Sequence, residues 1–165
     1  MSDTHTPSVR SSIVVEVPKE QAFSVFTDDI GSWWPPDHHI LEGKLDQMIF
    51  EPRVGGHVYD RATDGSECRW ARVLAYEPPE RIVISWDISL QWQLERDPAR
   101  TSEVEVRFIA ESPETTRVEL EHRHIDRHGE GWEQMHDAVD SPEGWDNGLR
   151  SFASRLAEMP AASPS

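Results

Sequence analysis

The sequence has 165 residues, which fits one compact domain with a sizeable core and is short for two. It carries 31 acidic against 16 basic residues, a formal net charge of -15, and such a surface repels phosphate backbones and anionic lipid heads. Nucleic acid and anionic membrane surfaces are therefore excluded as general partners. Seven Trp, five Phe and two Tyr are too many large rings for a disordered chain, so the composition predicts an acidic folded domain.

The chain lacks the signals of secretion and membrane insertion. Cys68 is the only cysteine, which excludes an intramolecular disulfide and a cysteine-rich metal site, and we interpret it as a half-buried strand residue. No charged segment followed by an apolar one opens the chain, and no apolar run approaches the roughly 20 residues of a membrane-spanning helix. We expect a cytoplasmic protein with one domain over residues 9–158 and flexible tails over residues 1–8 and 159–165, which are rich in small and polar residues.

The first elements are a strand and two short helices. Arg10–Val17 is rich in β-branched residues and predicts a strand, after which Pro18 suits the first turn of a helix. Apolar residues at one-, three- and four-residue spacing predict a helix over Lys19–Phe26. Asp28–Trp34 adds a short helical turn, which Pro35 stops.

Six further segments alternate in the manner of strands. They are Leu45–Glu51, Gly56–Arg61, Glu67–Tyr76, Arg81–Leu90, Ser102–Ala110 and Thr115–Ile125. Short segments of turn-forming residues separate them, so successive strands are expected to pair antiparallel. The alternation of apolar with polar side chains in Glu103–Phe108 predicts a sheet with one apolar face.

The last segment predicts an amphipathic helix, with Ser141 as its N-cap, Pro142 as its first residue and Met159 at its end. Its large apolar residues follow spacings of four, three and four: Trp145, Leu149, Phe152 and Leu156. Only this helix is long enough to cover the apolar face of the sheet. The predicted fold is α+β, a curved antiparallel sheet of six to seven strands wrapped around the C-terminal helix, with two short helices after the first strand.

The order of several short motifs carries a family resemblance. These motifs are Val17-Pro18, Trp33-Trp34, the hairpin over residues 50–56 (FEPRVGG), the turn over residues 77–81 (EPPER), residues 116–122 (TRVELEH) and Gly144-Trp145. The sequence resembles the START-like, helix-grip (SRPBCC) superfamily, and within it the bacterial proteins similar to activators of the ATPase of the ninety-kilodalton heat-shock chaperone. The resemblance spans residues 9–158. It implies the helix-grip fold more firmly than an activity, because members bind lipids, sterols, hormones or polyketides and some are enzymes.

The large rings predict a ligand cavity between the sheet and the last helix, since rigid rings give contact area at little cost in rotamer entropy. The predicted ligand-binding residues are Trp33, Trp34, Phe50, Tyr59, Trp70, Trp86, Phe108, His122, His124, Trp145 and Leu149. The alternative is that these rings simply fill the core. Trp92 and Trp132 lie in polar, loop-like stretches and suit a lid or a partner contact.

Two histidines are the candidates for acid–base chemistry. Alternation along Thr115–Ile125 points His122 and His124 inward, where they would orient a polar ligand group, shuttle a proton, or serve as hydrogen-bonded wall residues. His128 and His136 follow at spacings that fit no zinc motif, so we predict no metal and no cofactor.

Two further strand residues have no assigned direction, Tyr59 and Arg72. If Arg72 faces inward it becomes an anion anchor, and otherwise it lies on the solvated surface.

Three functions remain open from the sequence. The first is binding of an apolar or aromatic, lipid-like small molecule in the predicted cavity. The second is a chaperone-associated protein-interaction module, and the third is a cyclase- or hydrolase-type enzyme with a cavity histidine as acid or base. The chain contains no GxSxG, P-loop or GxGxxG motif, which disfavours covalent hydrolysis and nucleotide chemistry. A homodimer stays open.

Overall fold

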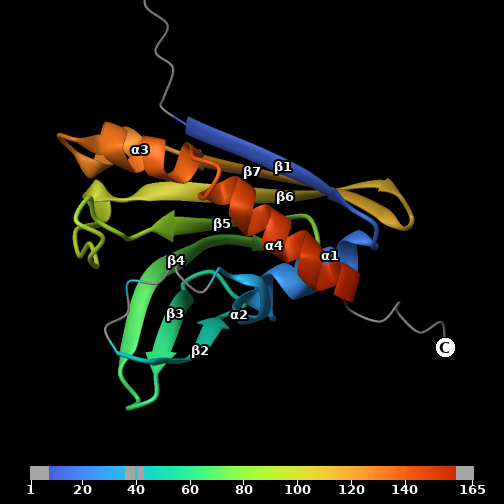
Figure 1. Ribbon diagram of the computed structural model, residues 1–165, viewed down its shortest axis with the longest axis horizontal. Coiled ribbons are helices and arrows are strands. Elements are labelled where there is room, and N and C mark those ends of the chain that lie inside the picture. Colours follow the sequence, from blue (N-terminus) through green and yellow to red (C-terminus); the bar gives the residue numbers. More distant parts are fainter. Residues whose placement is uncertain (1–7, 36–39, 41–42, 159–165) are drawn as a thin grey trace, which may run out of the picture.

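The computed structural model describes residues 8–35, 40 and 43–158 and contains one curved antiparallel sheet (Figure 1). The spatial order of its seven strands is β1-β7-β6-β5-β4-β3-β2. The strands are β1 (Ser8–Val15), β2 (Leu45–Phe50), β3 (His57–Ala62), β4 (Glu67–Glu77), β5 (Arg81–Trp86), β6 (Ser102–Ser112) and β7 (Thr115–Arg123). This confirms the predicted number of strands and their antiparallel pairing.

Alternation in β7 separates the two faces of the sheet. Its inward side chains are buried: Thr116, Val118, Leu120 and His122. The side chains between them are half-buried on the outer face. There Arg123 forms ion pairs with Glu103 and Glu105 at N–O distances of 3.2 and 3.1 Å. The outer face thus carries ion pairs between neighbouring strands, while the inner face forms one wall of the core.

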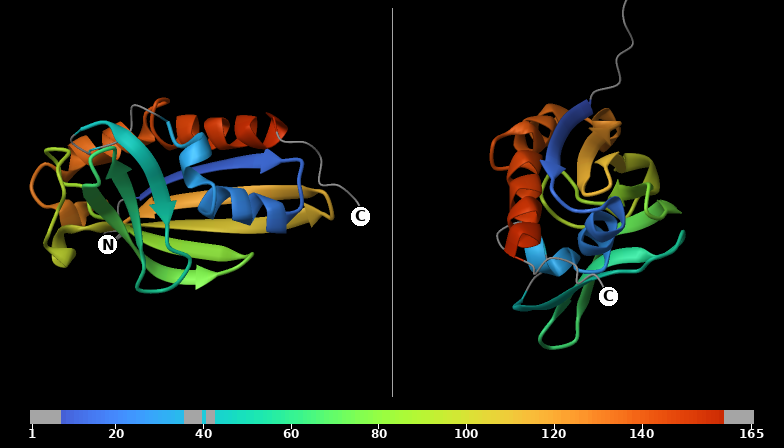
Figure 2. Two further views of the ribbon diagram at one scale, coloured as in Figure 1. Left: turned by 90° about the horizontal axis from the view of Figure 1, so that it is seen from below. Right: turned by 90° about the vertical axis from the view of Figure 1, so that its right-hand side faces the viewer.

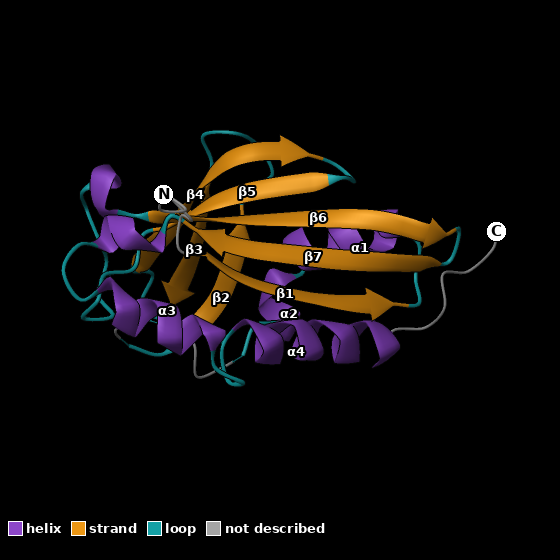
Figure 3. Ribbon diagram, turned by 90° about the horizontal axis from the view of Figure 1, so that it is seen from above, coloured by secondary structure: helices purple, strands orange, loops and turns teal. Residues whose placement is uncertain are grey.

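The helices lie on the inner side of this curved sheet (Figure 2). They are α1 (Lys19–Thr27), α2 (Ile30–Trp33), α3 (Trp132–Asp140) and α4 (Trp145–Glu158), with short 3-10 turns η1 (Pro98–Arg100) and η2 (Ile125–His128). Helices α3 and α4 follow one another along the same side of the sheet (Figure 3). The two short helices after β1 and the C-terminal helix confirm the predicted fold class.

Helix α4 buries the stripe that its sequence predicts. Trp145, Leu149, Phe152 and Leu156 are all nearly inaccessible to solvent and belong to the contiguous core. The hydroxyl of Ser151 also donates a hydrogen bond to the backbone carbonyl of Trp33, which ties α4 to the end of α2.

The beginning of the last helix differs from the prediction. Ser141 is not an N-cap: it follows the end of α3, where its hydroxyl donates to the carbonyl of Ala138 at 2.8 Å, and α4 begins at Trp145. Helix α3 was not predicted, because its sequence is polar and it buries only Met135 and Val139. Trp132 is therefore the first residue of a helix rather than part of a loop.

Four strands end earlier than predicted. Strand β1 ends at Val15 instead of Val17, and β2 ends at Phe50 instead of Glu51. Strand β5 ends at Trp86 instead of Leu90, and β7 ends at Arg123 instead of Ile125. At His124 the backbone turns into the left-handed region, with φ of 61°. The predicted strands were too long because alternation indicates only which face of the sheet a side chain takes. It does not indicate which residue makes the last hydrogen bond of the strand.

Candidate ligand-binding site

Five tryptophans form the centre of a buried ring cluster, which we define as the indole cluster: Trp33, Trp34, Trp70, Trp86 and Trp145. Their ring centroids form a continuous series of contacts, with separations of 5.6 Å from Trp33 to Trp34 and 5.1 Å from Trp34 to Trp70. Trp86 lies 5.8 Å from Trp70 and 5.4 Å from Trp145. Most of these pairs are tilted or edge-to-face, the arrangements that aromatic quadrupoles favour.

A second group of rings continues the cluster toward the other end of the sheet, and we define it as the phenylalanine cluster: Phe23, Phe26, Phe108 and Phe152. Phe26 contacts Trp33 at 4.7 Å and so joins the two clusters. It also makes edge-to-face contacts with Phe108 at 5.5 Å and with Phe152 at 5.2 Å. Phe50 lies beyond this group and reaches it through Tyr76, whose ring is 6.3 Å from that of Phe50.

The structure places most of the predicted site residues in this core. Ten of the eleven predicted residues are buried. Eight of these ten belong to the contiguous apolar core: Trp33, Trp34, Phe50, Trp70, Trp86, Phe108, Trp145 and Leu149. The ninth, His122, contacts this core through the ring of Trp86. The tenth, Tyr59, is buried outside that core. Its ring lies between two arginines, with the guanidinium carbons of Arg61 and Arg69 at 5.9 and 5.4 Å from the ring centroid.

His124 does not join the cluster. The predicted inward direction of His124 was wrong, because β7 ends one residue before it and strand alternation no longer applies. His124 is half-buried in a left-handed conformation, and its carbonyl accepts the backbone N–H of Arg127 at 3.0 Å. Its role in this structure is to turn the chain into η2.

Arg72 is committed to a structural ion pair. Its guanidinium makes two hydrogen bonds of 3.1 Å with the carboxylate of Asp87 and a third of 3.1 Å to the hydroxyl of Thr101. A guanidinium that is already held in this bidentate way has little capacity left for an anionic ligand. The structure therefore gives Arg72 the role of fixing the segment after β5.

A chain of polar side chains borders the indole cluster. The indole Nε1 of Trp145 donates to Nδ1 of His122 at 3.1 Å. The Nε2 atom of His122 lies 2.6 Å from the hydroxyl of Ser102, and the same hydroxyl lies 2.7 Å from Nε2 of His128. All four side chains are buried, with exposed fractions between 0% and 6%. They connect α4, β7, β6 and η2 at one end of the fold.

The direction of every hydrogen bond in this chain follows from its first donor. An indole nitrogen can only donate, so Nδ1 of His122 must be the acceptor and the ring proton must be on Nε2. That proton is donated to Ser102, whose own hydroxyl proton is then donated to Nε2 of His128. His128 consequently carries its proton on Nδ1, a buried atom for which the described part of the chain offers no acceptor.

Both histidines are held in the neutral form. The pKa of His122 is lowered to about 3, mainly by burial and to a smaller extent by the neighbouring rings of His128 and His136. Burial also lowers the pKa of His128, and Arg100 adds to this, while Glu95 and Asp87 act in the opposite direction. A protonated His122 would in addition present an N–H toward the indole N–H of Trp145, so the hydrogen-bond pattern requires the same neutral state.

Sequence reasoning missed Ser102 and His128. In the sheet, Trp86 of β5 pairs with Ser102 of β6, which brings this serine to the indole cluster. Ser102 has the same parity as Val104, Val106 and Phe108, so its inward direction could have been inferred. No comparable signal existed for His128, because its position depends on the turn at His124.

The indole N–H groups differ in whether they are satisfied. That of Trp33 donates to the carbonyl of Val25 at 3.2 Å, and that of Trp145 donates to His122. Nε1 of Trp86 is buried, and no acceptor for it exists among the described residues. A buried donor without a partner costs about 1–3 kcal/mol, and native proteins contain few of them. Trp86 therefore brings a buried, unpaired donor into the indole cluster.

Other features of the described residues are less suited to an apolar ligand. A groove of about 680 Å³ runs along β1, β7 and β6, and charged side chains such as Arg10, Arg107 and Glu121 line most of it.

Within residues 8–35, 40 and 43–158, no group of three or more His, Cys, Asp or Glu side chains is placed to hold a metal ion. None of the helices described is long and apolar enough to cross a membrane.

A curved antiparallel sheet that encloses a C-terminal helix, with a ring-lined interior, defines the helix-grip class of the SRPBCC superfamily. Within that class, residues 16–157 match the family described as activator of Hsp90 ATPase homolog 1-like protein. The chain belongs to this family. None of the curated proteins matches it.

Solved structures support the same placement. An anthrahydroquino-gamma-pyrone synthase, Txn09, complexed with a compound designated SUM, is 41% identical; the match covers 90% of this chain and 96% of that one, with a TM-score of 0.63. The self-sacrificing resistance protein CalC from Micromonospora echinospora is 28% identical over 96% and 99% of the two chains, with a TM-score of 0.69. An AHSA1 protein from Silicibacter pomeroyi shares the fold at 22% identity, with a TM-score of 0.60 and coverage of 91% and 97%.

Proposed function

We propose that this protein binds an apolar, aromatic small molecule between the sheet and α4, at the indole cluster. One observation carries the proposal: five buried indoles contact one another, and one of them, Trp86, has a buried N–H that no described group accepts. A flat aromatic ligand that inserts between these indoles would exchange contacts between indole rings for contacts between indoles and ligand. Because the two kinds of contact are alike, little contact energy is lost.

The similarity to known proteins agrees with this ligand class. The neighbour at 41% identity is named for a product that contains an anthrahydroquinone, which is a fused aromatic ring system. The match covers nine-tenths of this chain.

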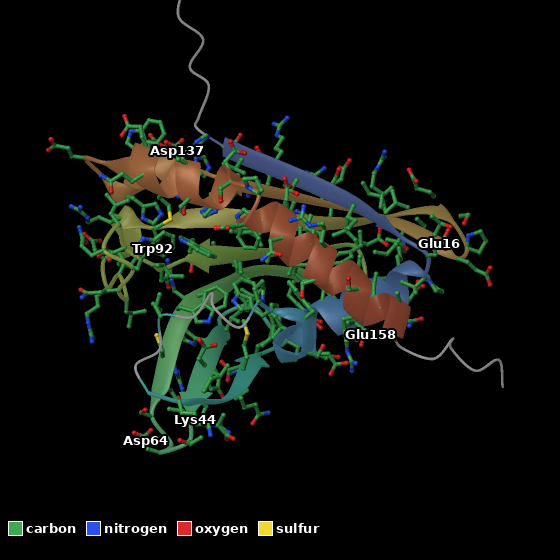
Figure 4. All side chains as sticks on the ribbon, viewed as in Figure 1. Glu16, Lys44, Asp64, Trp92, Asp137 and Glu158 are labelled. Carbon is green, nitrogen blue, oxygen red and sulfur yellow. The ribbon has the colours of Figure 1, made fainter. Side chains whose placement is uncertain are left out.

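A fluorescence titration tests the proposal directly. The indole emission would be followed while fatty acids, sterols, flavonoids and aromatic polyketides are added in turn. Saturable quenching by aromatic compounds at micromolar concentration is expected for the wild type, and Trp86→Ala should abolish it. Trp92→Ala is the matched control, because Trp92 is 48% exposed and lies outside the cluster (Figure 4). If no aromatic compound gives a saturable response, the proposal is wrong.

A reaction on the bound ligand is the second candidate function, and the synthase activity named for the neighbour at 41% identity favours it. The proposed residue for proton transfer is His122, because its ring centroid lies 5.1 Å from that of Trp86. Both of its nitrogens are hydrogen-bonded, so a transfer to or from the ligand would exchange one of these bonds. Replacing His122 and His124 together with Gln should abolish turnover of a ligand found in the titration while sparing its binding.

A chaperone-associated role has less support from the surface. The large exposed apolar side chains of the described residues come from different strands and loops: Val14, Leu45, Val54, Leu74 and Trp92. An interaction surface would be expected to gather such side chains in one patch. The ligand-binding function is therefore the one that the described residues support best.

A further inference from the structure

The polar atoms around Trp86 are engaged with one another. Its ring contacts those of Trp70, Trp145 and His122 at 5.8, 5.4 and 5.1 Å. Both nitrogens of His122 are occupied, and the hydroxyl of Ser102, which pairs with Trp86 across the sheet, bridges two histidines. The indole N–H of Trp86 thus takes no part in the hydrogen-bond chain that these side chains form.

The rings that contact Trp86 offer no charge to a bound anion. The rings that touch Trp86 carry no formal charge, because burial lowers the pKa of His122 so that its ring stays neutral. The guanidinium of Arg72 is bound to Asp87. A carboxylate in this environment would be buried without a compensating charge, which is costly, whereas a neutral oxygen needs only one donor.

We propose that the ligand is an aromatic ketone or quinone whose carbonyl oxygen accepts the Nε1–H of Trp86. The inference rests on the proposed function, since it names the chemical class of the ligand that the indole cluster binds. Fused rings occupy the stacking positions, and the carbonyl oxygen satisfies the buried donor. Aromatic hydrocarbons without such an oxygen leave this donor unpaired, so the same ring area yields weaker binding.

Two ligands of matched shape separate the carbonyl from the rings. Dissociation constants would be measured for 2-(hydroxymethyl)anthraquinone and 2-(hydroxymethyl)anthracene, which differ at the central ring and share the solubilising group. They would be compared for the wild type, Trp86→Phe and Trp33→Phe. Trp33→Phe is the matched control, because the N–H that it removes is already bound to the carbonyl of Val25.

We expect the protein to prefer the quinone over the anthracene, and this preference should depend on Nε1–H of Trp86. In the wild type the quinone binds more tightly than the anthracene, and Trp86→Phe lowers this ratio of affinities by about fivefold to a hundredfold. Trp33→Phe leaves the ratio unchanged. A ratio that is the same in the wild type and in Trp86→Phe overturns the inference and leaves the proposed function standing, whereas a wild type that binds neither compound overturns both.

A spectroscopic measurement replaces the variant if Trp86→Phe does not fold. In the ¹⁵N-labelled wild type, the indole proton of Trp86 should move downfield with the quinone, as expected for a new hydrogen bond, and not with the anthracene. Equal shifts with the two compounds overturn the inference.

Discussion

The phenylalanine cluster and the indole cluster lie on the same sheet and under the same helix, yet they differ in polarity. Phe23, Phe26, Phe108 and Phe152 bring no polar atoms, and they meet mostly edge to face. The indole cluster brings N–H groups into the core and is bordered by three hydrogen-bonded side chains, His122, Ser102 and His128. The phenylalanine cluster therefore needs no hydrogen-bond partner. The indole cluster, in contrast, keeps a buried donor, Nε1 of Trp86, for which the described residues offer no acceptor.

The phenylalanine cluster therefore contributes stability, and the indole cluster contributes recognition as well. An apolar ring contributes through area and close packing, so its removal is expected to act on folding alone. A buried polar group must be satisfied, and its position in the core therefore specifies what can lie beside it. Substitutions and pH are therefore expected to affect the two clusters differently.

The largest effect is expected in the phenylalanine cluster. Phe152 is fully buried, and Phe152→Ala should lower the free energy of unfolding by about 3–5 kcal/mol through lost burial and the cavity that remains. Urea denaturation measures the loss. Leu74→Ala, at a side chain that is 38% exposed, is the control and should change stability by less than about 1 kcal/mol. A small loss for Phe152→Ala would mean that this end of the core is loosely packed.

Two indoles in contact should respond differently to the same substitution. Trp145→Phe removes the donor to His122 and leaves its Nδ1 unpaired, which should cost about 1–3 kcal/mol beyond the loss of ring volume. Trp86→Phe loses a similar volume but no hydrogen bond, so it should cost less by about that amount. Thermal or urea unfolding without ligand compares the two. Equal losses would show that Trp86 has a partner of its own in the free protein.

The smallest effect concerns pH. His122 has a folded-state pKa of about 3 against 6.5 in the unfolded chain, so only the unfolded state takes up a proton as the pH falls below 6.5. The contribution of His122 is fully present above pH 6.5 and is lost progressively toward pH 3. At pH 5 the loss is about 2 kcal/mol, since the pH is then about 1.5 units below 6.5. Urea denaturation at pH 7 and pH 5 tests this, and His122→Gln should show a smaller decrease; the same decrease in both proteins would contradict the neutral assignment.

Much of the phenylalanine cluster and the indole cluster could be predicted from the sequence, because periodicity reports which way a side chain faces. Trp145, Leu149 and Phe152 follow the helical period, and Leu120 and His122 follow the strand period; all are buried as expected. The fold itself was implied by the family resemblance, which the match over residues 16–157 confirms.

The polar chain could not be predicted in the same way. Its contacts join residues that are 20 to 26 positions apart, and they depend on where strands end and how a turn is shaped. The left-handed turn at His124 brings His128 beside Ser102 and at the same time removes His124 from the inward face. A serine, two histidines and a tryptophan in separate elements have no shared pattern in the sequence, and only the folded chain shows that they form one hydrogen-bond series.

The pairing of β1 with β7 has a consequence for the synthesis of the chain. Strand β1 (Ser8–Val15) pairs with β7 (Thr115–Arg123), so the first strand of the sheet cannot pair until the last strand has been synthesised. At usual elongation rates this interval is roughly 5 to 20 seconds, during which the N-terminal strand has no native partner. The β2–β5 hairpins can assemble as they emerge, but the sheet closes at β1 only after β7 has emerged, and a nascent chain stalled before residue 115 would expose β1 to proteases and holding chaperones.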